Sequence, residues 1–428
     1  MAAAVLIVAG CGGDGGQKRT TQAPVPTATA PPPATTTAAP APEKTGRGLS
    51  IGLTESNGSL VRIAGDAPQP PPELQPWRDR LTALHPQLYR LAVDWASLQP
   101  DPAVPANLAL PADGCMRGAQ PCGAFAGIRD MLAAVASQQR ANRDFQAVVV
   151  FYGVPQWAAQ PAAGCERPGI QPRSRPVTDA GLRAYRELVR RVADLAGEEG
   201  AEIRYWSPWN EPNGAFFISP QRSRCSLDSP PVSAGVYAKL FRAMADELAQ
   251  IPGRHQLVLG DLAGVAQGSP RGTGSGEFVG ALPRDVVCAA DIVAQHAYVE
   301  LPGQKTRPGD PVESTRQALK AFPCADHTPM WITETGVGGL HAGDERRTDP
   351  AALRRQCVAF DAALRRWYDD PRIEAAFQYT FREDPAFPVG LVDAGLKRSY
   401  PTYDLLKAWG NRPHPGDPPP DLPARCRG

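Results

Sequence analysis

The chain has 428 residues, of which 42% are hydrophobic and 21% are charged, so it can bury a core that suits one large or two ordinary domains. Its formal net charge of +1 gives no basis for nucleic-acid binding, and no apolar stretch is long enough to predict a membrane-spanning helix. The function must therefore be inferred from individual sites.

The first residues are small and apolar and lead to a cysteine. Val8, Ala9, Gly10 and Cys11 resemble the lipobox of a bacterial lipoprotein signal, in which the cysteine becomes the lipidated first residue of the mature protein. The resemblance implies a signal over residues 1–11 and a lipid anchor on Cys11. A basic n-region is missing and the apolar part is short, which leaves the true translation start open. A disordered tail with a chance cysteine is the alternative.

Residues 12–47 are rich first in Gly and then in Pro, Thr and Ala, and they contain almost nothing large and apolar to bury. We expect a disordered tether here. A Pro-rich segment of this kind is semi-extended at about 3.1 Å per residue, so it would hold a folded domain away from a membrane or cell wall.

Nine cysteines fit an exported protein, and removing Cys11 leaves an even number for disulfides. The sequence cannot choose among the possible connectivities, but we favour pairs of neighbours along the chain. No CxxC motif or Cys/His cluster has the spacing of a zinc site, so we predict no metal. The favoured disulfides are Cys115–Cys122, Cys165–Cys225, Cys288–Cys324 and Cys357–Cys426.

From Leu49 onward, short apolar runs alternate with longer segments of helical period, the pattern of repeated βα units. The clearest helices are predicted between Thr178 and Gly200 and from Pro350 to Trp367, the latter with Asp349 as N-cap. Eight such units predict an α/β fold, a (β/α)8 TIM barrel. An open doubly wound sheet is disfavoured because no Gly-rich phosphate turn follows the early strands. The predicted strands are Leu49–Leu53, Leu88–Val93, Phe145–Phe151, Glu202–Ser207, Gln256–Asp261, Asp291–His296, Met330–Glu334 and Ile373–Thr380.

Two glutamates stand at strand ends. Trp209-Asn210-Glu211-Pro212 follows the fourth predicted strand, and Thr333-Glu334-Thr335-Gly336 closes the seventh. Barrel enzymes of this type build their sites at the C-terminal ends of the strands, so the two carboxylates are expected to meet.

These two motifs, in this strand order, resemble the clan A glycoside hydrolases over roughly residues 49–409. The resemblance implies that Glu211 is the acid/base and Glu334 the nucleophile of a retaining glycosidase. Acetal cleavage needs an acid on the leaving oxygen and a carboxylate on the anomeric carbon, about 5 to 5.5 Å apart in retaining enzymes. Two unrelated surface glutamates are the alternative.

The resemblance assigns further site residues one by one. Asn210 matches an Asn that holds the sugar 2-hydroxyl, and Arg90 an inward-facing Arg that keeps Glu334 ionised. His296 and Tyr298 match a His-x-Tyr pair whose Tyr hydrogen-bonds the nucleophile. A turn residue at Asn210, a structural salt bridge at Arg90 and a structural role for His296 are the alternatives.

Aromatic residues are the expected sugar platforms. Tyr379 or Phe381 in the eighth strand region takes the place where the clan expects a stacking ring, although the usual Trp is absent and a barrel-core role is equally open. Trp157 after the third strand and Trp209 before Glu211 are further stacking candidates.

We therefore expect residues 48–412 to form a catalytic domain, and 413–428 a C-terminal tail. The expected enzyme is an extracytoplasmic, membrane-anchored monomer without cofactor that acts on an extracellular polysaccharide or glycoconjugate. The motif around Glu211 leans toward families 39 and 5 of the clan, which leaves the sugar undetermined. The alternative is a non-catalytic carbohydrate-binding lipoprotein on a degenerate barrel. The combined presence of Glu211, Glu334, Asn210 and Arg90 argues against it, because a binding module does not need the full set.

Overall fold

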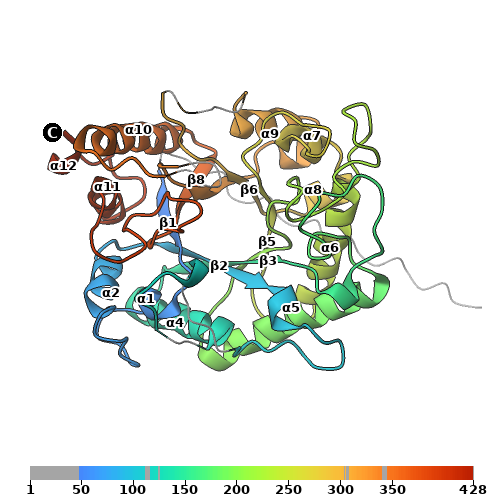
Figure 1. The fold of residues 1–428 in the computed structure, drawn as a ribbon, viewed down its shortest axis with the longest axis horizontal. Coiled ribbons are helices and arrows are strands. Elements are labelled where there is room, and N and C mark those ends of the chain that lie inside the picture. The colour runs from blue at the N-terminus through green and yellow to red at the C-terminus, as the bar shows by residue number, and fades with distance from the viewer. Residues whose placement is uncertain are drawn as a thin grey trace, which may run out of the picture. The chain divides into compact units, whose positions relative to one another are not determined.

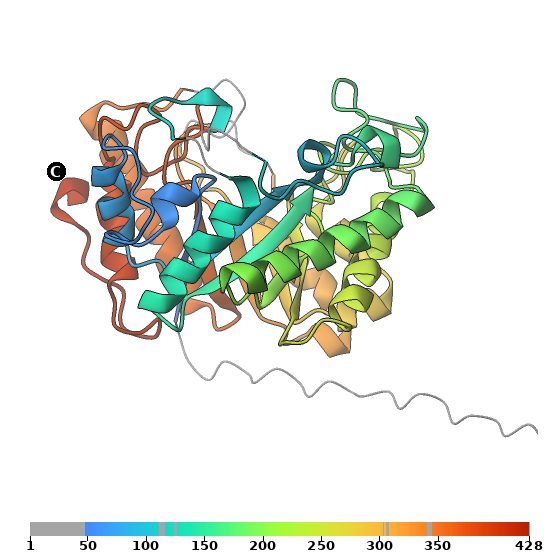
Figure 2. The ribbon, with the colours of Figure 1, turned by 90° about the horizontal axis from the view of Figure 1, so that it is seen from below.

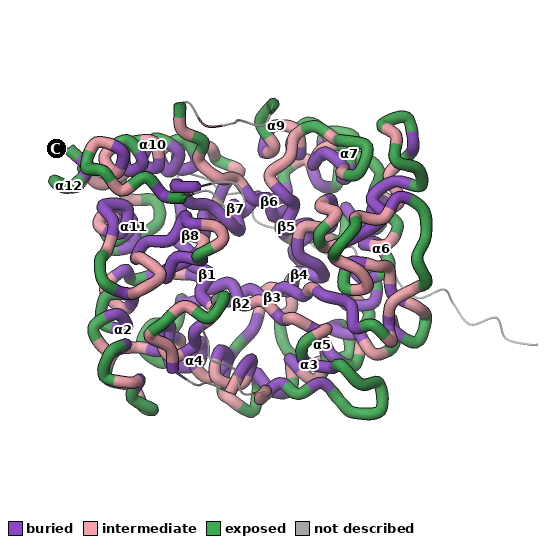
Figure 3. The backbone as a smooth tube through the Cα atoms, in the orientation of Figure 1, coloured by how far each residue is buried: buried purple, intermediate pink, exposed green. Residues whose placement is uncertain are grey.

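A computed structural model describes residues 48–110, 116–123, 126–302, 304, 308–339 and 345–427. The described residues form a closed barrel of parallel strands in the order β1 to β8, so the predicted (β/α)8 fold is confirmed. Figures 1 and 3 show the strands as a central ring with helices around them. The strands are β1 Ser50–Thr54, β2 Leu88–Asp94, β3 Gln146–Tyr152, β4 Tyr205–Ser207, β5 Gln256–Leu262, β6 Ile292–His296, β7 Met330–Thr335 and β8 Ile373–Tyr379.

Helices separate successive strands, and in the side view α4 and α5 cross the outer face of the barrel (Figure 2). The α-helices are α1 Gly58–Val61, α2 Gln75–Thr82, α3 Trp95–Leu98, α4 Gly127–Ala141, α5 Asp179–Glu199, α6 Ser233–Leu248, α7 Ser275–Gly280, α8 Arg284–Cys288, α9 Pro311–Leu319, α10 Pro350–Asp369, α11 Pro401–Gly410 and α12 Ala424–Arg427. Short 3-10 turns are η1 Met116–Gly118, η2 Gln156–Ala158 and η3 Pro323–Ala325. None of these helices is both long and apolar enough to cross a membrane.

The two clearest predicted helices begin where expected, and α10 extends past its predicted end at Trp367 to Asp369. Thr178 caps α5 by accepting a hydrogen bond from the amide of Gly181, and Gly200 ends the helix with a left-handed φ of 73°. Asp349 caps α10 by accepting from the amide of Ala352, and Pro350 occupies the first turn. Local sequence signals therefore set both ends of α5 and the start of α10.

Side chains fill the inside of the barrel. A compact cluster of buried residues includes Val148, Ile292, Trp331 and Phe377, and the ring centroids of Tyr205 and Trp331 lie 4.5 Å apart. Gly52 of β1 is required at this point, because a Cβ there would lie 2.4 Å from the Phe377 ring. The barrel is thus a packed core whose functional groups lie at its rim.

Three of the favoured disulfides are confirmed, namely Cys165–Cys225, Cys288–Cys324 and Cys357–Cys426. The fourth favoured pair includes Cys115, which lies outside the described residues, as do Cys11 and the whole of 1–47. Each confirmed disulfide joins segments that belong to different βα units. Cys165–Cys225 links the loops that follow β3 and β4.

Candidate active site

Glu211 and Glu334 lie together at the C-terminal ends of β4 and β7. Glu211 follows Ser207, the last residue of β4, and has a left-handed φ of 40°, which is uncommon for a residue other than glycine. Its backbone amide donates to the carbonyl of Asp261, at 2.9 Å, and this bond helps to hold the unusual conformation. One oxygen of each glutamate and one ring nitrogen of His296 all lie within 4.8 Å of one another. The structure therefore brings the two predicted carboxylates together.

Arg90, on β2, is 2% exposed and connects three strand ends. Its Nη1 donates to Glu334 Oε1 at 2.7 Å, its Nη2 to Asn210 Oδ1 at 2.6 Å and its Nε to Asp261 Oδ1 at 3.1 Å. The inward orientation expected from the sequence is thus present. Because the guanidinium holds both the carboxylate of Glu334 and the amide oxygen of Asn210, the Asn210 NH2 group is turned away from Arg90.

His296 and Tyr298 approach the two glutamates from the end of β6. His296 Nδ1 lies 2.8 Å from Glu211 Oε1 and 3.4 Å from Glu334 Oε2. The Tyr298 hydroxyl donates to Glu334 Oε2 at 2.6 Å. Both oxygens of Glu334 are therefore held by protein groups. Glu211 Oε2, in contrast, has no hydrogen bond within the described part of the chain, and the Glu211 side chain is 25% exposed.

Asp261, near the end of β5, belongs to the same cluster and was not predicted as a site residue. It is fully buried, has a left-handed φ of 48°, and its Oδ1 lies 3.5 Å from His296 Nε2. The sequence did contain a signal, because Asp261 ends an apolar strand in the same way as Glu334 does. A search for every acid at a predicted strand end would have found it.

Burial and neighbouring charges act in opposite directions on the pKa values of His296 and Asp261. Burial alone would lower the pKa of His296, but the charge of Glu334, together with Asp261 and Glu211, raises that pKa from 6.5 to about 9. Burial alone would raise the pKa of Asp261, but Arg90 and His296 hold it well below its ordinary value. At neutral pH, His296 is therefore an imidazolium and Asp261 a carboxylate.

The donor atoms of Glu211, His296 and Glu334 have a spacing that an ion could bridge. An ion would have to displace the proton of His296, because histidine binds metals in its neutral form. In addition, Arg90 already occupies one oxygen of Glu334.

Aromatic rings form one wall beside Glu334. The ring centroid of Tyr298 lies 4.8 Å from that of Phe387 and 6.4 Å from that of Tyr379, and all three rings are only partly buried. Tyr379 thus lies next to the ring whose hydroxyl contacts Glu334, and its role as a platform stays a prediction. Phe387 was missed, because it lies in the irregular loop after β8, where strand alternation gives no signal.

Two of the predicted stacking residues, Trp209 and Phe381, are buried. Trp209 is 1% exposed; its ring packs against Tyr185 of α5, and its Nε1 donates to the carbonyl of Phe217. Phe381 is fully buried and packs against Tyr403 of α11. Neither ring has a free face for a sugar, because helices outside the barrel cover both.

Trp157 lies in the loop after β3, as expected. Its ring makes an edge contact with Trp95, at 5.9 Å between centroids, and its Nε1 donates to the carbonyl of Gln99. These contacts fasten the loop after β3 to the loop after β2. The ring remains partly exposed, so its role in stacking stays a prediction.

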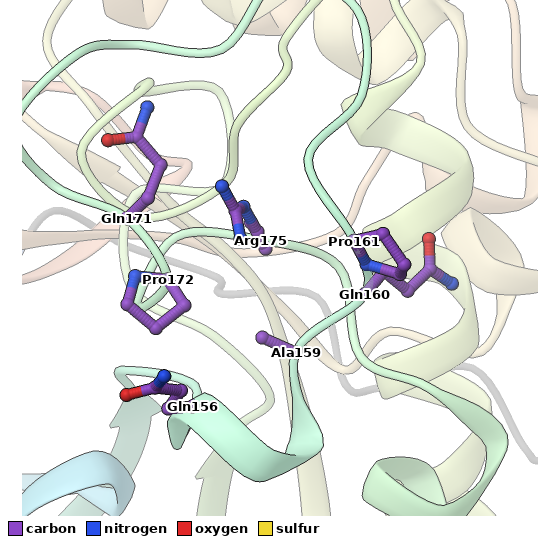
Figure 4. A pocket seen from close by; sticks show the side chains of 7 residues that line it. All are labelled: Gln156, Ala159, Gln160, Pro161, Gln171, Pro172 and Arg175. Atoms are coloured by element: carbon purple, nitrogen blue, oxygen red, sulfur yellow. The ribbon is translucent and has the colours of Figure 1, made fainter.

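A separate pocket of about 410 Å³ lies in the loop after β3. In Figure 4, Gln171 and Pro172 form one side, Gln160 and Pro161 the other, and Arg175 lies between them. None of the residues that line this pocket belongs to the carboxylate cluster. It is therefore not the candidate active site.

The fold and the cluster define a (β/α)8 barrel protein with a carboxylate pair at the ends of β4 and β7. No family model matches the chain, and no curated protein matches it. Among solved structures, SrfJ from Salmonella typhimurium is similar with a TM-score of 0.56 and 9% identity, over 87% of this chain and 77% of that one. The endo-beta1,6-glucanase BT3312 is similar with a TM-score of 0.54 and 11% identity, over the same shares of the two chains. At such low identity, these similarities show the fold alone.

Proposed function

We propose that the protein is a retaining glycoside hydrolase of the clan A type, with Glu211 as acid/base and Glu334 as nucleophile. The observation that carries the proposal is the approach of the two carboxylates, whose nearest oxygens lie within 4.8 Å at the ends of β4 and β7. Retaining enzymes separate their carboxyl groups by about 5 to 5.5 Å, whereas inverting enzymes need about 6.5 to 9.5 Å to admit a water molecule. The short separation supports double displacement.

The contacts of Glu334 suit a nucleophile. Arg90 donates to one of its oxygens and Tyr298 to the other, so the carboxylate is held in one orientation beside a positive charge. In the first step, one oxygen of Glu334 bonds to the anomeric carbon while the bond from that carbon to the leaving oxygen breaks. The result is a glycosyl-enzyme ester at Glu334.

The contacts of Glu211 suit the acid/base. His296 holds Oε1, and Oε2 is left to give its proton to the leaving oxygen. In the second step, Glu211 takes a proton from water, whose oxygen attacks the anomeric carbon and releases Glu334 as a carboxylate. Asn210 would bind the sugar 2-hydroxyl, and Tyr298, Tyr379 and Phe387 would supply the apolar wall of the subsite.

The substrate that we propose is an extracellular polysaccharide or glycoconjugate, and families 39 and 5 remain the proposed neighbourhood within the clan. The three disulfides fit an oxidising compartment outside the cytoplasm. A lipid anchor on Cys11 and a tether over 12–47 would then hold the enzyme at a membrane, with residues 48–412 as the catalytic domain. We propose that it works as a monomer without a cofactor.

Labelling with a panel of activated 2-fluoro glycosides tests the proposal. Mass spectrometry of the digested protein should find a covalent sugar on Glu334, and Glu334→Gln should abolish the adduct. Glu211→Ala should lower kcat on a polysaccharide about 10²- to 10⁴-fold, the usual range for loss of a general acid. The absence of an adduct, together with no hydrolysis of any aryl glycoside or polysaccharide, would favour the non-catalytic sugar-binding alternative.

A further inference from the structure

Asp261 is a third buried acid in the cluster, and the proposed double displacement gives it no bond to make or break. Its Oδ1 faces both cations of the site, Arg90 Nε at 3.1 Å and His296 Nε2 at 3.5 Å. Its Oδ2 and His296 Nε2 are both buried without a hydrogen bond among the described residues. A fully buried carboxylate is costly unless it is paired with positive charge, and Asp261 is paired with two cations. What the site gains from this third acid calls for an explanation.

The charges of the cluster balance before the reaction. With His296 as imidazolium and a proton on Glu211, two cations, Arg90 and His296, face two anions, Asp261 and Glu334. Without Asp261 the same groups would carry one excess positive charge in a buried site. His296 would then lose its proton, because it is the more readily deprotonated of the two cations.

The charges also balance in the intermediate. After the first step Glu334 is a neutral ester and Glu211, having given its proton away, is a carboxylate. The negative charge has therefore moved from Glu334 to Glu211. His296 Nδ1 lies 3.4 Å from the first of these carboxylates and 2.8 Å from the second, so the same imidazolium faces both.

We propose that Asp261 is a positioning residue that keeps His296 protonated through both half-reactions, so that His296 is the counter-ion of Glu334 first and of Glu211 afterwards. The inference rests on the proposed retaining mechanism. Glu334 and Glu211 each carry a negative charge in only one of the two states, whereas Asp261 carries one in both. Asp261 is thus the permanent anion that Arg90 and His296 require.

The charged groups around His296 come from four strands, and their arrangement supports this role. Glu211 follows β4, Asp261 is on β5, Glu334 is on β7, and Arg90 on β2 binds both Asp261 and Glu334. The pKa of His296 is raised to about 9, which is the direction expected for an imidazole beside carboxylates. Removal of the Asp261 charge is therefore expected to lower it.

Histidine NMR tests the inference without turnover. The chain has six histidines, so ¹⁵N-labelled imidazole signals can be assigned by loss of one signal in His296→Gln. In the wild type, His296 should stay doubly protonated from pH 6 to above pH 8, and also in the 2-fluoroglycosyl-enzyme. In Asp261→Asn its titration should move at least one pH unit lower. A wild-type His296 that is neutral at pH 7.5, or an unchanged titration in Asp261→Asn, would overturn the proposal.

Kinetics give a second measurement that a merely structural role would not reproduce. In Asp261→Asn, kcat/KM for an unactivated glycoside should be close to the wild-type value at pH 5.5, where His296 is still charged. At pH 8 it should be about tenfold or more below the wild-type value at the same pH. A loss of equal size at all pH values contradicts the proposal. Asp361→Asn is the matched control, because Asp361 is a buried partner of Arg365 on α10, away from the site.

The two proposals fail in different ways. If Asp261→Asn does not fold, the wild-type titration still decides the state of His296. If the protein hydrolyses no glycoside, the proposed function fails, and with it the role in the two half-reactions. The titration of the free protein then still decides whether Asp261 keeps His296 protonated. Normal glycosidase activity with a neutral His296 would remove the role of Asp261 and leave the proposed function intact.

Discussion

The hydroxyl of Tyr298 makes a single strong contact, to Oε2 of Glu334 at 2.6 Å. A hydrogen bond to a charged group contributes about 1.5 to 3 kcal/mol, so its loss in Tyr298→Phe should lower kcat/KM roughly ten- to hundredfold. Steady-state kinetics on an aryl glycoside would measure the effect. Tyr403→Phe is the matched control, since its hydroxyl donates to the carbonyl of Arg80 away from the site.

The outcome separates two roles of Tyr298. If Tyr298 orients Glu334, the proposed nucleophile, the loss should appear in kcat/KM with little change in thermal unfolding temperature. Activity of Tyr298→Phe within twofold of the wild type would mean that Arg90 alone holds Glu334. Because Tyr298→Phe keeps the ring, a large drop in unfolding temperature would instead show that the hydrogen bond from the hydroxyl to Glu334 stabilises the fold.

At the same scale, the sequence located polar site residues better than aromatic ones. Glu211, Glu334 and Arg90 are found by their place on strands, because parallel strands bring their ends to one rim. The burial of Trp209 and Phe381 was not expected, because the exposure of a ring depends on the outer helices, here α5 and α11, which pack over it. Periodicity within one strand carries no information about that packing.

At the scale of elements, the predicted strands agree closely with the observed ones, and the largest difference is at β4. The strand was predicted from Glu202 but begins at Tyr205. The side chain of Gln139, on α4, hydrogen-bonds both backbone groups of Glu202. It accepts from the amide at 2.9 Å and donates to the carbonyl at 2.8 Å. A helix side chain thus replaces the strand pairing at this point, which the strand's own sequence cannot predict.

The disulfide Cys165–Cys225 joins two loops on the side of the barrel where the site lies. Its removal in Cys165→Ala/Cys225→Ala should cost about 4 kcal/mol of folding free energy by the chain-entropy argument for a loop that spans 60 residues. Because one of these loops begins just after Glu211, we also expect a raised KM for a polymeric substrate. Denaturant unfolding and kinetics on a polysaccharide would measure the two effects.

Cys288–Cys324 supplies the matched control for that prediction. It joins the end of α8 to η3, just before β6 and β7 begin, at the end of the barrel opposite the carboxylates. Cys288→Ala/Cys324→Ala should therefore lower stability and leave KM unchanged. Equal changes of KM in both double variants would show that the disulfides act through overall stability and not through the loops at the site.

At the scale of the whole molecule, the charge cluster links the stability of the fold to pH. The pKa of His296 is raised from 6.5 to about 9 on folding, chiefly by Glu334 against the opposing effect of burial, so the folded state binds this proton more tightly. The resulting stabilisation is fully present below pH 6.5 and is lost as the pH rises through 9. Asp261 acts in the opposite sense, because its pKa is lowered and its contribution is lost as the pH falls below about 4.

These signs predict how the free energy of unfolding changes with pH. Between pH 6.5 and 9 the wild type should lose roughly 3 kcal/mol more than His296→Gln, since one pKa unit corresponds to about 1.4 kcal/mol. Denaturant unfolding of both proteins at pH 6, 7.5 and 9 would measure the difference, and the slope left in the variant would report the other titrating groups. If the two proteins show parallel pH dependences, the pKa of His296 is not raised on folding, and His296 is neutral at pH 7.5 and 9. The barrel rim would then hold an excess negative charge that Arg90 alone must balance.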